Sequence, residues 1–219
     1  MKTNKEKYRE LSKKQKKEYI WEYYKYHIVG IVSLLLIIGS LINTWFINPP
    51  AKAAVSITFM NKYINTDETD EIKNELVKLI ITEEDHNKDV FINNYFLTDN
   101  IENADLDMAS NTKFMANISA KELDVIILNK EKFENLSAIG TFLELDKLML
   151  NDDLDKIKDK LVKQKNIDTS KYGYYGIDVT DNEKLKSIMG DGEKFMCIIN
   201  NTTRLEESMK VINWFLQYD

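Results

Sequence analysis

Residues 125–128 read Val-Ile-Ile-Leu. A short continuous apolar run is typical of a central strand that is covered on both faces. Outward from this run, apolar residues recur either at every second position, which indicates strands, or every three to four positions, which indicates helices. Strands that alternate with helices predict an α/β fold, a three-layer α/β/α domain with a mostly parallel sheet.

The predicted elements follow from this periodicity. Further strands are expected at 54–59, 90–97, 174–179 and 195–199. The first expected helix starts at Asp67, the second covers 105–118, and the third stops at Gly140. A fourth includes Leu154, Ile157 and Leu161, and a short fifth includes Leu185 and Ile188. The last starts at a Thr203–Glu206 capping box. The side chains expected to face the core from these helices are Ile72, Leu76, Leu79, Ile80, Met108, Met115, Ile118, Phe133, Leu136, Ile139, Leu205, Met209, Ile212 and Leu216.

Residues 28–47 read IVGIVSLLLIIGSLINTWFI and contain no ionisable side chain. A helix of this length spans about 30 Å, the thickness of the hydrocarbon core of a bilayer. A helix that is apolar on all faces over this length is rarely the core helix of a globular protein. The sequence therefore predicts a transmembrane helix at 27–47, preceded by a basic tail at 1–26. A linker at 48–52 contains Pro49 and Pro50, and the exported domain covers 53–219.

Charge predicts the orientation of this helix. Residues 1–26 hold nine Lys or Arg and four Glu, a net charge of +5, so the whole-chain value of −6 leaves −11 for the rest. Under the positive-inside rule the N-terminus stays in the cytoplasm and the C-terminal domain is extracellular. The expected partners are then the lipid bilayer and a membrane or envelope protein. Residues 1–26 are too short to support a nucleic-acid-binding role.

One alternative concerns cleavage of the exported domain. Ala51-Lys52-Ala53 has the A-x-A form that a signal peptidase recognises. Cleavage after Ala53 would release the domain. The apolar run is longer than the core of a signal peptide, which favours an uncleaved signal anchor.

Cysteine and histidine counts exclude several chemistries. Cys197 is the only cysteine, so the chain has no intramolecular disulfide and no Cys-rich zinc site. It lies in an apolar run and is expected to be a buried core residue. His86, the only histidine after His27, sits in a polar run typical of a solvated turn. Because no catalytic or nucleotide-binding motif is present, we expect no enzyme activity, cofactor or metal.

Four segments resemble the extracellular solute-binding proteins of ABC importers, which have the type II periplasmic-binding-protein fold. Glu-Leu-Asp-Val-Ile-Ile at 122–127, followed by Gly-Thr-Phe-Leu-Glu-Leu-Asp at 140–146, is similar to the "DVI…G.L.PLD" segment of sugar receptors. Tyr-Gly-Ile-Asp at 175–178 is similar to their "YGIP" stretch, with Asp178 in place of proline. Lys-Val-Ile-Asn-Trp-Phe-Leu at 210–216 is similar to their "A.KFI.WL" helix.

The resemblance implies one lobe of that fold. The receptors are about twice as long as this chain, and their ligand lies in a cleft between two lobes. Here the interval between Ile177 and Phe195 is too short to hold a second lobe. A single lobe supplies one wall of the cleft, so it loses much of the surface that buries a ligand.

A ligand site in such a sheet is expected beyond the carboxyl ends of the parallel strands. Amide, carboxylate and phenol groups after the predicted strands suit a hydroxylated ligand, although ordinary loop composition is the favoured explanation for them. A calcium site at Asp99, Glu102, Asp105 and Asp107 lacks the EF-hand spacing, which favours a solvated acidic loop. The candidate ligand-binding residues are Asn61, Tyr63, Asp99, Asn100, Asn129, Asn200 and Asn201.

Three functions are compatible with these features. The first is a non-catalytic, single-pass membrane protein whose exported domain docks on a protein or envelope component. The second is a tethered receptor that binds a small solute, a sugar or peptide, for an ABC importer. The third is a hydrolase that uses Asp/Glu pairs, but carboxylates alone give no distinguishing spacing.

Overall fold

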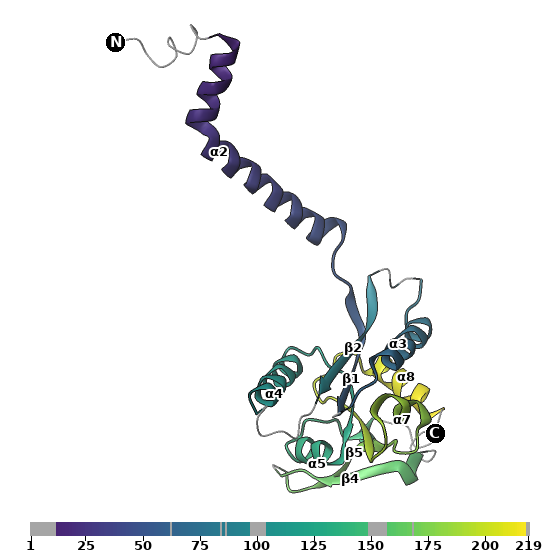
Figure 1. Cartoon of the computed structure of the whole chain (residues 1–219). Coiled ribbons are helices and arrows are strands. Elements are labelled where there is room, and N and C mark those ends of the chain that lie inside the picture. Colours follow the sequence, from purple (N-terminus) through teal and green to yellow (C-terminus); the bar gives the residue numbers. More distant parts are fainter. Residues whose placement is uncertain are drawn as a thin grey trace. The chain divides into compact units, whose positions relative to one another are not determined.

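The computed structural model describes residues 12–61, 63–83, 85, 87–96, 104–148, 157–167 and 169–217. The chain divides into two compact units, Met1–Pro50 and Ala51–Asp219. Figure 1 shows a helical N-terminal unit and an α/β C-terminal unit.

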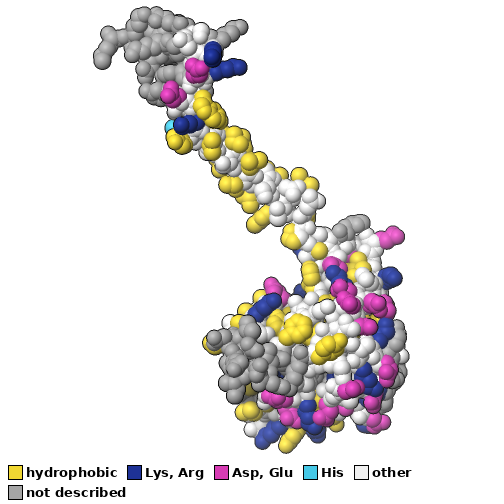
Figure 2. Space-filling view, in the orientation of Figure 1, with side chains coloured by type: hydrophobic (Ala, Val, Ile, Leu, Met, Phe, Trp, Pro, Cys, Tyr) yellow, Lys and Arg dark blue, Asp and Glu magenta, His cyan; other side chains and the backbone are white. Residues whose placement is uncertain are grey.

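The described part of the N-terminal unit is a long helix. Helix α2 (Lys13–Ile42) starts at a capping box, in which Ser12 Oγ accepts from the Gln15 backbone and the Gln15 side chain accepts from the Ser12 backbone. It continues as the π-helical turn η1 (Asn43–Ile47), and Pro49 and Pro50 follow, which cannot continue the hydrogen-bond ladder. The span Tyr24–Ile47 is long and apolar enough to cross a membrane. Figure 2 shows hydrophobic side chains along this helix.

The C-terminal unit is built on a six-stranded mixed sheet with the order β2-β1-β3-β6-β5-β4. β1 is parallel to β2 and to β3, whereas β6 is antiparallel to β3 and β5, and β4 is antiparallel to β5. The prediction of a mostly parallel sheet is therefore confirmed for the β2-β1-β3 half and wrong for the other half. The strand bounds are β1 (Lys52–Asn61), β2 (Lys88–Phe96), β3 (Val125–Asn129), β4 (Leu161–Lys165), β5 (Tyr172–Asp178) and β6 (Lys194–Ile198).

Helices cover both faces of this sheet, as predicted (Figure 1). One apolar cluster packs the sheet against α3 (Thr66–Ile80), α7 (Glu183–Met189) and α8 (Leu205–Leu216). A second cluster, on the other face, packs it against α4 (Ala104–Ser119) and α5 (Lys130–Ala138). The chain moves from β1 outward to β2 and then back past β1 to β3. Right-handed crossovers in these opposite directions place α3 and α4 on opposite faces.

Asparagine side chains start three of the helices. Asn65, not the predicted Asp67, caps α3, and Asn129 caps α5. Asn182 caps α7, and its Nδ2 also donates to the Phe215 carbonyl, which ties α7 to α8. The predicted capping box at Thr203 is wrong, because α8 starts after Arg204 without a side-chain cap.

Several predicted core contacts are wrong. Met108 and Met115 are exposed on α4, which instead packs through Phe114 and Ile118. Leu79, Ile139 and Leu205 are also exposed, whereas Cys197 is fully buried as predicted. The helix expected through Leu154, Ile157 and Leu161 is replaced, within the described residues, by a 3-10 turn at Lys158–Lys160 and the edge strand β4. His86 and residues 149–156 lie outside the described residues.

Candidate functional site

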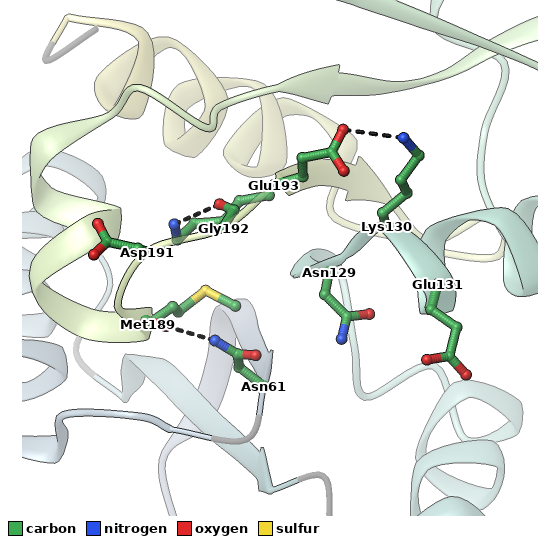
Figure 3. Close-up of a pocket in the computed structure, with 9 residues that line it drawn as sticks. Asn61, Asn129, Lys130, Glu131, Met189, Asp191, Gly192 and Glu193 are labelled. Atoms are coloured by element: carbon green, nitrogen blue, oxygen red, sulfur yellow. Dashed lines mark hydrogen bonds and ion pairs between the residues drawn. The ribbon is translucent and has the colours of Figure 1, made fainter. Parts of the chain in front are cut away.

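A cavity of about 230 Å³ lies at the carboxyl edge of β1 and β3. Asn61 ends β1 and Asn129 ends β3, and the antiparallel strand β6 starts beside them at Lys194. The crossovers from β1 leave toward β2 and return to β3, so this is the point in the sheet at which α/β folds bind ligands. The remaining walls come from the start of α5 and the segment between α7 and β6 (Figure 3).

The structure brings Asn61 and Asn129 together in this cavity, as expected for carboxyl ends of neighbouring parallel strands. Each amide already has one structural contact. Asn61 Nδ2 donates to the Met189 carbonyl at 2.6 Å, and Asn129 Oδ1 accepts from the Lys132 backbone at 3.0 Å. Figure 3 shows the two amides on opposite sides of the same space. Asn61 Oδ1 and Asn129 Nδ2 are then the groups available to a hydroxylated ligand.

Lys194 is among the residues of this site that were not predicted from the sequence, and it is the most deeply buried cation there. Its side chain is only 2% exposed, and its Nζ donates to the Gly192 carbonyl at 2.8 Å. Burial lowers the pKa of this ammonium group, and the nearby Asp191 opposes the shift. The available signal was a lysine directly before the buried run at 195–199. A charged residue next to five apolar ones indicates a strand start at a polar edge.

The loop that carries Lys194 depends on glycine. Gly190 has φ +70° and Gly192 has φ +116°, conformations that side chains with a Cβ rarely adopt. This geometry turns the chain from the end of α7 into β6. It presents the Gly192 carbonyl to Lys194 and holds both residues at the cavity.

The cavity rim is acidic rather than basic. Of the described residues that line it, Lys130 and Lys194 are cationic, and three carboxylates, Glu131, Asp191 and Glu193, oppose them. Lys130 Nζ contacts Glu193 Oε1 at 3.1 Å in an exposed ion pair. The rim therefore suits a neutral polar molecule better than an anion.

The other predicted site residues lie elsewhere. Tyr63 is exposed close to Gly190, just outside the cavity lining. Asn200 and Asn201 are at the opposite edge of the sheet, because β6 is antiparallel. There the Asn200 amide donates to the Gly140 carbonyl and the Asn201 amide donates to the Ile118 carbonyl. The prediction that Asn200 and Asn201 lie at the carboxyl edge with the other candidates is therefore wrong.

The remaining candidates are Asp99 and Asn100 for a ligand and Asp99, Glu102, Asp105 and Asp107 for calcium. Asp99, Asn100 and Glu102 lie outside the described residues, and the side chains of Asp105 and Asp107 are likewise not described. Within the part of the chain that the structure describes, no three His, Cys, Asp or Glu side chains gather in a metal-binding arrangement.

Comparison with known proteins finds no match among protein-family models, curated proteins or solved structures.

Proposed function

We propose that this chain is a non-catalytic, single-pass membrane protein that presents its α/β domain outside the cell for interaction with a protein or envelope component. The observation that carries the proposal is the helical span Tyr24–Ile47. None of its most apolar part is buried within the protein. Exposing the apolar side chains of this 24-residue span to water costs free energy, whereas the hydrocarbon core of a bilayer accommodates them.

The direction of insertion follows from the flanking charges. Lys14, Lys16, Lys17 and Lys25 precede the apolar run, and the next lysine is Lys52. Cytoplasmic retention of the basic flank leaves the unit Ala51–Asp219 on the outer side.

Reporter fusions after Asp219 test this topology. Alkaline phosphatase is expected to be active there and green fluorescent protein dark, with the full chain in the membrane fraction. As a control, both reporters are fused after Lys25, where the outcomes should be reversed. A fluorescent fusion after Asp219, or a soluble full chain, would contradict the proposal.

Partner docking is tested in the same membranes by photo-cross-linking. A photoreactive residue in place of Tyr63, which is exposed beside the carboxyl edge, is expected to give one discrete adduct. The same residue in place of Leu79, exposed on α3, is the matched control. Adducts that are identical at both positions, or absent from both, would argue against a specific partner at this edge.

A tethered small-solute receptor is the second candidate function, and the carboxyl-edge cavity favours it. We propose that the fold is one lobe of the type II periplasmic-binding-protein kind. The parallel arrangement β2-β1-β3, with a cavity at its switch point, supports this assignment. A volume of about 230 Å³ lies below the usual range of drug-sized pockets, which favours a single sugar ring or smaller.

Thermal-shift screening of the full chain against monosaccharides and dipeptides tests the receptor. A ligand at 100 times its dissociation constant stabilises a protein by about 2.7 kcal/mol. The stabilisation should be lost in Asn61→Ala and retained in Asn200→Ala, whose side chain lies at the other edge. A flat response to every solute would leave only the docking function.

A further inference from the structure

A second cavity, of about 690 Å³, lies at the opposite, amino edge of the sheet. Its walls come from the start of β1, the middle of β2, the turn between α4 and β3, and the segment before α8. This volume lies within the range that holds a small organic ligand. None of the predicted ligand-binding residues is among the described residues that line it.

Positive charge is concentrated in this cavity. Its described lining contains Lys52, Lys121 and Arg204 against one carboxylate, Glu122. Even when Asp124, the buried partner of Arg204, is included, cations remain in excess. The segment after residue 47 has a net charge of −11, so a cationic pocket is unusual within it. Such a pocket attracts anions.

Arg204 is held in a fixed orientation. Its Nε donates to Asp124 Oδ2 at 2.7 Å and its Nη2 donates to the Lys121 carbonyl at 2.9 Å. The Asp124 carboxylate is fully buried and also accepts from the Ser56 backbone, at 2.7 Å, and from the Thr202 hydroxyl. A guanidinium has more N–H donors than the two that Arg204 uses toward Asp124 and the Lys121 carbonyl. Arg204 can therefore still donate to a ligand without reorientation.

The wall from β1 and β2 supplies polar and aromatic groups. Asn93 Nδ2 donates to Ser56 Oγ at 2.7 Å, and the Ser56 side chain is almost fully buried. Phe91, which is 38% exposed, lines the same cavity. Hydroxyl and amide groups beside an aromatic ring suit the uncharged part of a small organic anion.

Lys121 occupies a backbone position that favours glycine. Its φ is +59°, and it follows α4 in a Schellman turn, with Glu122 N donating to Asn117 O and Lys121 N donating to Ile118 O. A lysine in this left-handed conformation costs stability relative to glycine. Its carbonyl holds Arg204 and its side chain lines the cavity, so both of its polar ends serve this site.

We propose that the amino-edge cavity binds a small molecule through a phosphate group. A phosphate monoester has three peripheral oxygens and a charge of about −1.5 to −2 at neutral pH, which matches three separate cations better than a single carboxylate does. This inference goes beyond the proposed function and does not depend on the membrane topology. The phosphate can belong to a soluble ester or to a lipid headgroup, and the experiment separates these sources.

Calorimetric titration of the full chain in nanodiscs of neutral lipid tests the proposal, with sn-glycerol 3-phosphate as the probe and glycerol as the uncharged control. Saturable binding of the phosphate ester alone is expected. Lys52→Gln and Lys121→Gly should each weaken it about tenfold. A weaker apparent affinity in nanodiscs that contain phosphatidic acid, a phosphate monoester, than in nanodiscs that contain the anionic diester phosphatidylserine identifies the lipid headgroup as a competitor, and equal affinities in the two identify a soluble ligand.

Matched controls separate binding from folding. Lys78→Gln removes an equal charge from α3, on the other face, and Ser170→Gly relieves a left-handed residue, with φ +56°, outside the cavity lining. Neither should change the affinity, and Lys121→Gly should unfold no earlier than the wild type. The proposal is overturned if neutral-lipid nanodiscs give no saturable binding, or if the two cavity variants bind like their controls.

Discussion

The two edges of one sheet differ in charge and in internal support. At the carboxyl edge, the described lining has two lysines and three carboxylates, and its ion pair, Lys130–Glu193, is exposed. At the amino edge, three cations face one carboxylate, and the supporting ion pair, Asp124–Arg204, has a fully buried carboxylate. The position usual for ligands in α/β sheets therefore holds the smaller cavity, and the opposite edge holds the larger and more cationic one.

This difference follows from the antiparallel half of the sheet. Because β6 runs opposite to β3, its end delivers the segment 199–204 to the amino edge, where Arg204 meets Asp124. A fully parallel sheet would have delivered these residues to the carboxyl edge. The reversal moves Arg204, the only arginine in the sequence of the unit Ala51–Asp219, away from the switch point.

The largest expected effect is the loss of the buried ion pair at the amino edge. Asp124→Asn leaves the partly buried Arg204 guanidinium without its counter-charge and is expected to lower the free energy of unfolding by about 3 kcal/mol. Urea unfolding followed by circular dichroism measures this. Glu193→Gln, at the exposed pair of the carboxyl edge, is the control and should leave the midpoint unchanged. Equal losses from the two variants would abolish the distinction between the edges.

Replacing Asn129, at the carboxyl edge, by alanine is expected to cause a smaller loss of stability. Asn129→Ala removes the cap of α5 and should cost about 1 kcal/mol, whereas Asn129→Asp keeps an acceptor for the Lys132 backbone and should retain most of the stability. Thermal unfolding of the two variants gives the comparison. If both lose the same stability, the amide has a role other than capping.

Replacing Lys121, at the amino edge, by glycine is expected to stabilise the protein. Lys121→Gly removes the strain of the left-handed backbone and should raise the free energy of unfolding by about 0.5–1 kcal/mol. Urea unfolding of Ser170→Gly should show a gain of similar sign, because that residue has the same backbone conformation. A destabilised Lys121→Gly protein would mean that the lysine side chain contributes to folding rather than to binding.

The smallest effect is a pH dependence at the carboxyl edge. Burial lowers the pKa of Lys194, so the unfolded chain binds this proton more tightly than the folded protein does. The contribution of Lys194 to stability therefore rises with pH as the ordinary lysine pKa of 10.5 is approached. The stability of the wild type relative to Lys194→Met should increase between about pH 8 and pH 10.

The difference from Lys194→Met isolates this residue. Lys130 and Lys147 have raised pKa values from hydrogen bonds to Glu193 and Glu144, and their contributions fall with pH in both proteins. They therefore cancel in the comparison. A difference that is constant with pH would show that Lys194 titrates normally.

The spacing of apolar residues predicted correctly those elements whose pattern fits only a helix or only a strand. The run at 125–128 is a central strand in the structure, and Ile72, Leu76 and Ile80 lie on the buried face of α3. Leu154, Ile157 and Leu161 have helical spacing, but residues 161–165, which read Leu-Val-Lys-Gln-Lys, form an edge strand in which no residue is fully buried. An edge strand has one neighbour and little burial, so its pattern is weak, and the helical reading was wrong there.

The residues of the carboxyl-edge cavity were predictable only where the direction of a strand follows from the sequence. The carboxyl ends of β1 and β3 are fixed by their parallel pairing, so Asn61 and Asn129 were expected together, and the structure places both at one cavity. The direction of β6 is not encoded in periodicity, because the short helix α7 can join strands of either orientation. Asn201 and Arg204 were therefore not assigned to the amino edge from the sequence.

Cys197 makes the chain convenient for labelling experiments. Its thiol is fully buried, lies under Gly176 and has a pKa that burial raises well above the ordinary value. Maleimides react with accessible thiolates, so the folded protein should resist them. A cysteine introduced on either sheet edge can thus carry a fluorophore or spin label in the native background, and late modification of Cys197 would record each opening of the core.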